Sequence, residues 1–125
     1  MTITADIVLV IEDDPSLAAS MEMLLRAAQV EVLSAGNGLE ALQLLEHHKP
    51  DLILLDMKMP IMDGWEFAKL FYQKYGHTIP IIVLTAAENA GKRAEEIQAD
   101  DFVSKPFQID ELLKKLSRFV RVEIF

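Results

Sequence analysis

The chain has 125 residues, the size of one domain, and we expect a single domain over residues 1–125. Hydrophobic residues make up 51% and charged residues 26%, a balance typical of a globular fold with a real core. The net charge of −8 repels nucleic-acid phosphates, which argues against nucleic-acid binding by this chain alone. The absence of cysteine excludes disulfides, thiolate metal sites and thiol nucleophiles.

The first residues, MTITADIVLVIEDD, contain no basic leader, and their apolar run is short and interrupted by acidic residues. They therefore do not match the pattern of a signal peptide. No segment approaches the roughly 20 consecutive apolar residues that a membrane-spanning helix needs. We expect a cytoplasmic protein without a membrane association.

Ten predicted elements alternate along the chain. Apolar runs rich in branched residues mark the strands, and apolar residues at steps of three and four mark the helices. The first half of the chain has a strand at Ile7–Ile11, a helix with apolar positions Leu17, Met21, Leu24, Leu25 and Ala28, a strand at Val30–Leu33, and a helix with Leu39, Leu42 and Leu45 on one face. A strand at Leu52–Leu55 and a helix over Trp65–Tyr75 come next, followed by a strand at Ile81–Leu84 and a helix over Ala90–Ile97. The last two elements are a weaker strand at Phe102–Val103 and a helix over Ile109–Val120.

Capping residues mark several helix boundaries. Asp14 can cap the first helix with Pro15 at its first position. Asn37 and Asp63, each followed by glycine, open the second and third helices, and Gly76 is expected to end the third.

Three strand segments, at 7–11, 52–55 and 81–84, are apolar at consecutive positions instead of alternating. Strands covered by helices on both faces show this pattern, which indicates a parallel sheet. Five such strands joined through five helices predict a doubly wound α/β fold with helices on both faces. The tail at 121–125 alternates apolar residues and is interpreted as either a short extra strand or a truncated linker.

Polar side chains follow four of the predicted strands. Glu12 and Asp13 end the first run, Asp56 the third and Thr85 the fourth, while Lys105 follows the fifth. Because the carboxyl ends of parallel strands line one edge of a sheet, we expect these five residues to converge there. Each alone has an ordinary explanation, such as a turn residue or a solvated lysine, and only their joint placement indicates a site.

Three carboxylates brought together repel one another unless a cation lies among them. Mg²⁺ prefers oxygen ligands and commonly uses one or two carboxylates together with a phosphate oxygen, so it is the cofactor that this group predicts. With the metal present, one carboxylate can attack phosphorus and become an acyl phosphate. Lys105 would then supply a second positive contact and Thr85 a hydrogen-bond donor.

Four motifs in register, VLVIEDD, LILLDMKMPIMDG, IIVLTA and DDFVSKPF, resemble those of response-regulator receiver domains of two-component signal transduction, in particular single-domain chemotaxis receivers. The resemblance implies a flavodoxin-like sheet of strand order 2-1-3-4-5. It also implies that Asp56 accepts a phosphoryl group from the phosphohistidine of a sensor histidine kinase. Asp13, Asp56 and the Lys58 backbone carbonyl would ligate Mg²⁺, with Glu12 positioning the ion, and Lys105 and Thr85 would bind the phosphoryl oxygens.

The same resemblance implies a switch. Thr85 would move toward the phosphoryl group and Phe102 would swing inward, reshaping the surface of the fourth helix, fifth strand and fifth helix for an unknown downstream partner or for a phosphorylation-dependent homodimer. The family position of Pro106 usually takes a cis peptide bond. Ala87, where some relatives carry a polar residue that handles water, predicts slow self-dephosphorylation.

Other functions are less well supported. A phosphorelay intermediate and a non-phosphorylated protein-binding module remain alternatives, although the module usually comes with a lost acid or lysine. A phosphohydrolase with an aspartyl nucleophile would need a second aspartate where Lys58 stands, and a flavin phosphate would be repelled by Glu12, Asp13 and Asp14. We therefore expect a switch that acts chemically only on itself and is not an enzyme.

Overall fold

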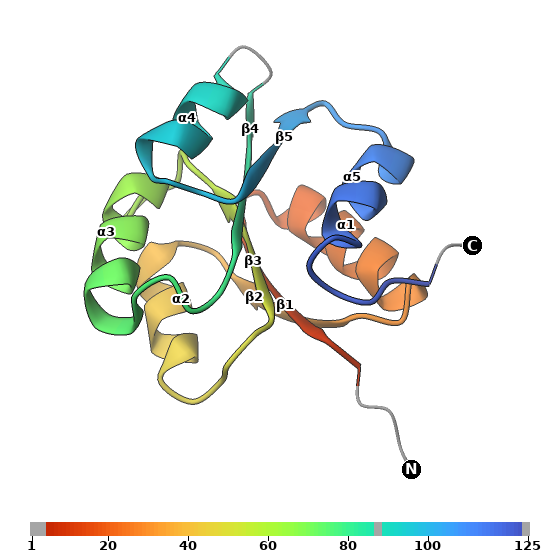
Figure 1. The fold of residues 1–125 in the computed structure, drawn as a ribbon, viewed down its shortest axis with the longest axis horizontal. Coiled ribbons are helices and arrows are strands. Elements are labelled where there is room, and N and C mark those ends of the chain that lie inside the picture. The colour runs from red at the N-terminus through yellow and green to blue at the C-terminus, as the bar shows by residue number, and fades with distance from the viewer. Residues whose placement is uncertain (1–4, 87–88, 124–125) are drawn as a thin grey trace.

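The computed structural model describes residues 5–86 and 89–123, in which strands and helices alternate (Figure 1). The strands are β1 (Ile7–Ile11), β2 (Glu31–Ala35), β3 (Leu52–Asp56), β4 (Ile81–Ala86) and β5 (Asp101–Lys105). The helices are α1 (Pro15–Ala27), α2 (Gly38–Leu45), α3 (Gly64–Tyr75), α4 (Ala90–Glu96) and α5 (Ile109–Leu116). All strand pairs are parallel and the order is β2-β1-β3-β4-β5, which confirms the predicted doubly wound, flavodoxin-like fold.

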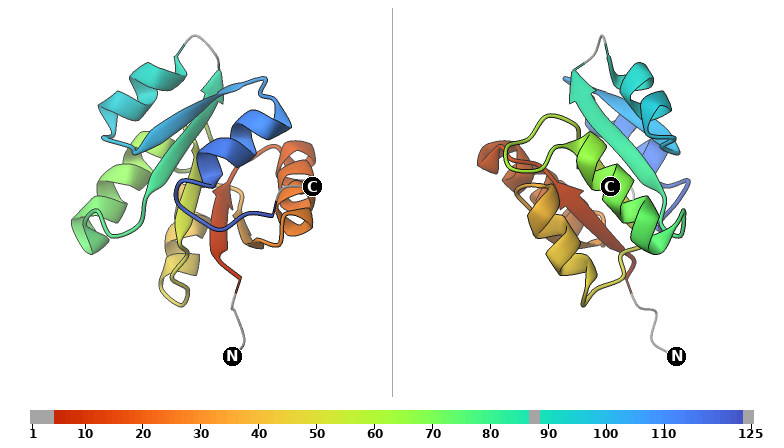
Figure 2. Two further views of the ribbon diagram at one scale, coloured as in Figure 1. Left: turned by 45° about the vertical axis from the view of Figure 1, so that its right-hand side comes forward. Right: turned by 90° about the vertical axis from the view of Figure 1, so that its left-hand side faces the viewer.

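The helices form a layer on each face of the sheet, with α1 and α5 on one side and α2, α3 and α4 on the other (Figures 1 and 2). Alternate residues of a strand point to opposite layers. In β1, Val8 and Val10 join the cluster beneath α1 and α5, while Leu9 and Ile11 join the cluster beneath the other three helices. This two-sided burial explains why the strand is apolar at every position.

Side chains cap three of the helices as predicted. The carboxylate of Asp14 accepts the N–H of Ser16 at 2.9 Å, ahead of a helix that begins with Pro15. Asn37 and Asp63 each accept the N–H three residues on, at 2.9 and 3.0 Å. These bonds satisfy amide donors that the first helical turn leaves without partners.

Most element boundaries agree with the prediction within two residues, but the prediction that the last helix reaches Val120 is wrong. Helix α5 ends at Leu116, and the Ser117 hydroxyl donates to the Lys114 carbonyl oxygen at 2.6 Å. The N–H groups of Phe119 and Val120 both donate to the Leu116 carbonyl at 2.9 Å. The chain therefore tightens into turns, which carry the buried Val120 onto the core.

The tail is held by backbone hydrogen bonds. The Arg121 N–H donates to the Asp6 carboxylate at 2.7 Å, and the Glu123 N–H donates to the Ala28 carbonyl at 2.8 Å. Residues 121–123 do not form the extra strand that was considered, and the last two residues lie outside the described part of the chain. Among the described residues, no helix has the length and apolar character needed to cross a bilayer.

The close approach of Gly64 to Met57 gives a test of how tightly the loop after β3 is packed. A methyl group at Gly64 would lie 2.6 Å from the Met57 sulfur and 2.7 Å from its Cα. We expect Gly64→Ala to lower the free energy of unfolding by about 1–3 kcal/mol, as overpacking does. Gly91→Ala is the control, because its methyl group would lie 3.4 Å from the nearest Phe102 ring carbon. Equal urea midpoints for Gly64→Ala and the native chain would contradict the prediction.

Candidate functional site

The carboxyl edge of the sheet brings the predicted site residues together. Glu12 and Asp13 directly follow β1, Asp56 is the last residue of β3, and Lys105 is the last residue of β5. Thr85 lies in β4 next to Leu84, which pairs with Asp56 in the sheet register. The parallel alignment of the strands therefore places residues from distant parts of the sequence at one edge.

Three of these residues form a carboxylate cluster. One carboxylate oxygen from each of Glu12, Asp13 and Asp56 lies within 4.8 Å of the others. Glu12 and Asp56 are 4% and 6% exposed, whereas Asp13 is exposed. Since charged side chains are rarely buried without partners, two buried acids at one edge require compensation by positive charge or hydrogen bonds.

The ammonium group of Lys105 supplies part of this compensation. Its Nζ lies 2.7 Å from Glu12 Oε1 and 3.3 Å from Asp56 Oδ2. Backbone amides contribute as well, because the Asp14 N–H donates to Glu12 Oε2 and the Lys58 N–H donates to Asp56 Oδ1, both at 3.2 Å. The two buried acids thus share one ammonium group and have one amide each.

Burial and charge act in opposite directions on this pair. Burial raises the pKa of Glu12, and the Asp56 carboxylate adds to that effect, while the Lys105 ammonium lowers it in part. Burial also acts to lower the pKa of Lys105, but Glu12 and Asp56 outweigh it and leave the pKa raised. Lys105 therefore stays charged, and Glu12 takes up a proton more readily than an ordinary glutamate.

The remaining predicted residues lie nearby. Thr85 is buried at the end of β4, and the Lys105–Pro106 peptide bond is cis, as predicted. Phe102 is 38% exposed, with its ring against Gly91 of α4. Ala87, on which the expected slow dephosphorylation depends, lies outside the described residues.

The structure adds residues to the site that the sequence did not single out. Asp13 and Lys58 line a cavity of about 390 Å³. The other residues that line it are Met59, Pro60, Asp63 and Trp65. The position of Trp65 directly after the Asp63-Gly64 turn is the sequence signal that points to it, but only the folded chain shows that Trp65 lines the same cavity as Asp13.

The donor set fits a hard divalent cation. All three acidic side chains offer oxygen ligands, and Lys105 forms ion pairs with two of them, Glu12 and Asp56, which leaves the exposed Asp13 carboxylate beside them. Mg²⁺ takes such oxygen ligands and retains several bound waters. Because the Asp13 side chain is exposed to solvent, water molecules can reach an ion bound there. The residues present therefore suit Mg²⁺ and not a thiolate-bound metal.

A family model described as the response regulator receiver domain matches residues 8–117, which include the five strands except for Ile7 at the start of β1. The chain belongs to the response-regulator receiver family. Proteins of this family are signalling modules of two-component systems, and their receiver domains bind Mg²⁺ at the acidic site. The four sequence motifs had implied this family, and the comparison confirms it.

Receiver domains with solved structures match nearly the whole fold. Chemotaxis response regulator CheY4 of Vibrio cholerae is 32% identical, with a TM-score of 0.83 over 92% of this chain and 98% of that one. The receiver domain of sensor histidine kinase PA1611 from Pseudomonas aeruginosa PAO1 is 31% identical, with a TM-score of 0.81 over 92% of this chain and 97% of that one. The latter structure has a magnesium ion coordinated in its active-site cleft.

Full-length relatives are longer than this chain. Response regulator MprA of Mycobacterium sp. (strain KMS) is 34% identical over 116 residues, which cover 91% of this chain and 50% of that protein. The chain thus spans about half the length of the curated relatives that it matches.

Removal of one acid from the cluster tests the metal site. We expect Asp13→Asn to weaken Mg²⁺ binding about tenfold or more, whereas Asp110→Asn on α5 removes the same charge and leaves the affinity unchanged. Trp65 is the single tryptophan and lines the cavity beside Asp13, so its fluorescence can follow the titration. Equal affinities for the two variants would contradict the assignment.

The acidic site also predicts a pH dependence. Mg²⁺ binds the deprotonated carboxylates, and the raised pKa of Glu12 brings its protonation closer to neutral pH. We expect the affinity for Mg²⁺ to fall as the pH is lowered, starting above the ordinary glutamate pKa of 4.5. An affinity that stays constant down to pH values below 4.5 would contradict this expectation.

Proposed function

We propose that the chain is a phosphoacceptor switch in which Asp56 takes a phosphoryl group from the phosphohistidine of a sensor histidine kinase. The observation that carries this proposal is the contact of Lys105 with Asp56 and Glu12, beside the exposed Asp13. An acid with a cation on one side and an oxygen-rich metal site on the other suits the attack on a phosphoryl group. We extend the assignment to the whole chain, residues 1–125, as one receiver domain.

Each residue of the site would have its own role in phosphoryl transfer. An Asp56 oxygen would form the new bond to phosphorus while the bond from phosphorus to the donor histidine nitrogen breaks. The Lys105 ammonium, 3.3 Å from Asp56 Oδ2, and the Thr85 hydroxyl would contact the oxygens of the transferred group. Asp13, Asp56 and the Lys58 carbonyl would hold Mg²⁺, with Glu12 as positioning residue; the bound ion would offset negative charge on that group.

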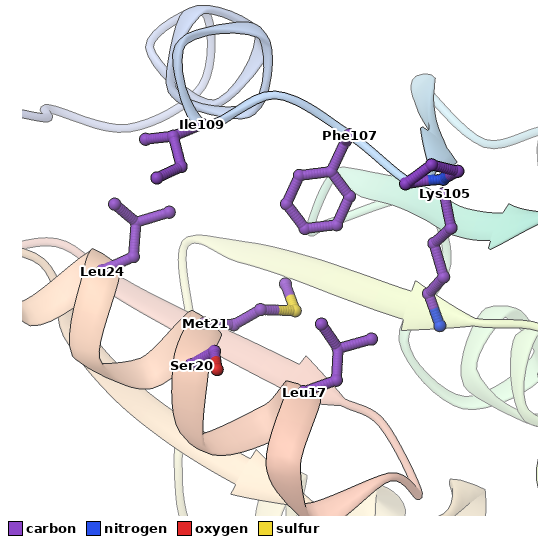
Figure 3. A pocket seen from close by; sticks show the side chains of 8 residues that line it. Leu17, Ser20, Met21, Leu24, Lys105, Phe107 and Ile109 are labelled. Carbon is purple, nitrogen blue, oxygen red and sulfur yellow. The ribbon is translucent and has the colours of Figure 1, made fainter.

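An apolar groove beside the site supplies a surface for the kinase. It has a volume of about 360 Å³ and lies between α1 and the segment from Lys105 to Ile109 (Figure 3). Leu24 and Ile109 face each other across it, and Ile109 is 56% exposed. Lys105 lines the groove and also contacts Glu12 and Asp56. A protein bound in the groove in the cytoplasm would therefore bring its histidine close to Asp56.

The output surface would consist of α4, β5 and α5. Phe102 is partly exposed between Gly91 of α4 and Lys115 of α5, whose Nζ lies 4.5 Å from the ring centroid. A change at Thr85 in the neighbouring strand would reach this surface through the pairing of Thr85 with Ser104. A downstream partner, or a second phosphorylated copy of the chain, would bind the shifted packing.

The alternatives make different demands on the same residues. A phosphorelay intermediate would use the same chemistry but pass the group on to a second histidine. A non-phosphorylated binding module would not need the buried Glu12 and Asp56 to share an ammonium group, an arrangement that is costly to bury. The complete set of acids and lysine therefore favours the phosphoacceptor.

Labelling with a small acyl phosphate tests the proposal. We expect the native chain in Mg²⁺ to gain the mass of one phosphoryl group, and Asp56→Asn to gain none, because the amide has no nucleophilic oxyanion. Asp110→Asn is the control and should label like the native chain. If the native chain does not label, or if Asp56→Asn labels equally, the switch is not built on Asp56.

A surface variant separates docking from chemistry. We expect Ile109→Ser to slow phosphotransfer from the cognate kinase, identified by profiling the kinases of the source organism, by about tenfold. Its labelling by a small acyl phosphate should not change, because that donor needs no docking surface. Met23→Ser is the matched control, since Met23 is 74% exposed on α1 but does not line the groove. Equal slowing of both donors would contradict a docking role.

A further inference from the structure

Trp65 touches two functional parts of the molecule. It is the second residue of α3 and lines the cavity that Asp13 and Lys58 also line. In addition, the guanidinium carbon of Arg93 lies 5.2 Å from the centroid of the Trp65 ring. Because Arg93 belongs to α4, a single side chain connects the mouth of the acidic site to that helix.

Glu96 completes the contact. Arg93 donates from one terminal nitrogen to Glu96 Oε1 at 2.6 Å, and the Arg93 side chain is 21% exposed. Arg93 is the main cause of a lowered pKa at Glu96, to which a hydrogen bond from the Trp65 side chain also contributes. We call these three side chains the α3–α4 clasp. A guanidinium over an indole is a favourable form of cation–π contact, and the carboxylate fixes its orientation.

The clasp contains an unsatisfied donor. Among the described residues, Arg93 Nε is the buried side-chain nitrogen that has no hydrogen-bond partner. A buried donor without an acceptor costs free energy, so the guanidinium is held in this place at a cost. Unsatisfied groups of this kind in native structures need an explanation other than stability alone.

The loop between Asp56 and α3 lines the same cavity as Trp65. Met59, which lines the cavity with Lys58, packs together with Trp65 against the apolar cluster beneath α2, α3 and α4. The same loop carries the Lys58 carbonyl that would face the metal. We therefore expect a change in the orientation of the indole to alter the packing of this loop, which carries one ligand of the site.

We propose that Arg93 and Trp65 are positioning residues for the metal site, and that the clasp couples cation binding to α4. This inference rests on the proposed function, since it takes the acidic cluster as the place where Mg²⁺ binds. In this proposal the Arg93 guanidinium fixes the orientation of the indole, and the indole in turn limits the movement of the loop that carries Lys58. The Lys58 carbonyl is then already in place before the cation binds, so binding does not have to order the loop. By linkage, a cation that is bound more tightly because of the clasp must stabilise the clasp by the same factor.

Calorimetric titration with Mg²⁺ tests the positioning role. We expect Arg93→Gln to weaken binding about fivefold, at the lower end of ordinary coupling between sites. Lys92→Gln is the matched control, because Lys92 is exposed on the same helix and loses the same charge. Loss of a positive charge by itself strengthens the attraction for a cation, so a weakened affinity in Arg93→Gln alone isolates the clasp.

Two further variants distinguish loss of the clasp from a folding defect. Arg93→Lys keeps a cation near the indole without the planar guanidinium and should recover part of the affinity. Trp65→Leu should bind as weakly as Arg93→Gln, and the double variant no more weakly than either, because both remove one interaction. If the variants unfold at the same urea concentration as the native chain, their weaker affinity for Mg²⁺ does not come from a folding defect.

Hydrogen exchange gives the reciprocal measurement. We expect Mg²⁺ to slow exchange in α4, residues 90–96, in the native chain and in Lys92→Gln, but not in Arg93→Gln. The inference is overturned if Arg93→Gln binds Mg²⁺ as tightly as Lys92→Gln, or if α4 is protected equally in both. If the native chain binds no Mg²⁺, the proposed function fails as well, so the two failures are distinguishable.

Discussion

Two buried carboxylates, those of Glu12 and Asp56, share the ammonium group of Lys105 at the carboxyl edge of the sheet. The rest of the site depends on this balance of charge. One ammonium group cannot neutralise two buried acids and the nearby Asp13, so the edge suits a hard cation. The fold supplies the constraint, because the parallel sheet places the carboxyl ends of β1, β3 and β5 at the same edge.

The sequence predicted the architecture well because its signals are local and strong. Consecutive apolar residues in β1 and β3 are buried on both faces, and Asp14, Asn37 and Asp63 cap the helices that they precede. The end of α5 was not predictable, since Phe119 and Val120 continue the helical apolar pattern although they lie in turns. There the backbone bonds to the Leu116 carbonyl decide the shape, and sequence periodicity does not report them.

The candidate site was predictable in its residues but not in its pairings. The positions after the strands identified the acids and Lys105, yet only the folded chain shows that Lys105 lies closer to Glu12 than to Asp56. The contact of Trp65 with Arg93 joins residues whose spacing carries no pattern. The charged residues of α4 have the same pattern in the sequence whether they are solvated or, as Arg93 does, lie over an indole ring.

The central claim is that the shared ammonium group leaves a place for a divalent cation between Asp13 and Asp56. Crystals grown with Mn²⁺ in place of Mg²⁺ test it most directly, because anomalous scattering locates the ion without reference to the protein density. We predict one strong peak coordinated by Asp13, Asp56 and the Lys58 carbonyl, with Lys105 still beside Asp56. A peak bound elsewhere, or no peak at saturating Mn²⁺, would contradict the account.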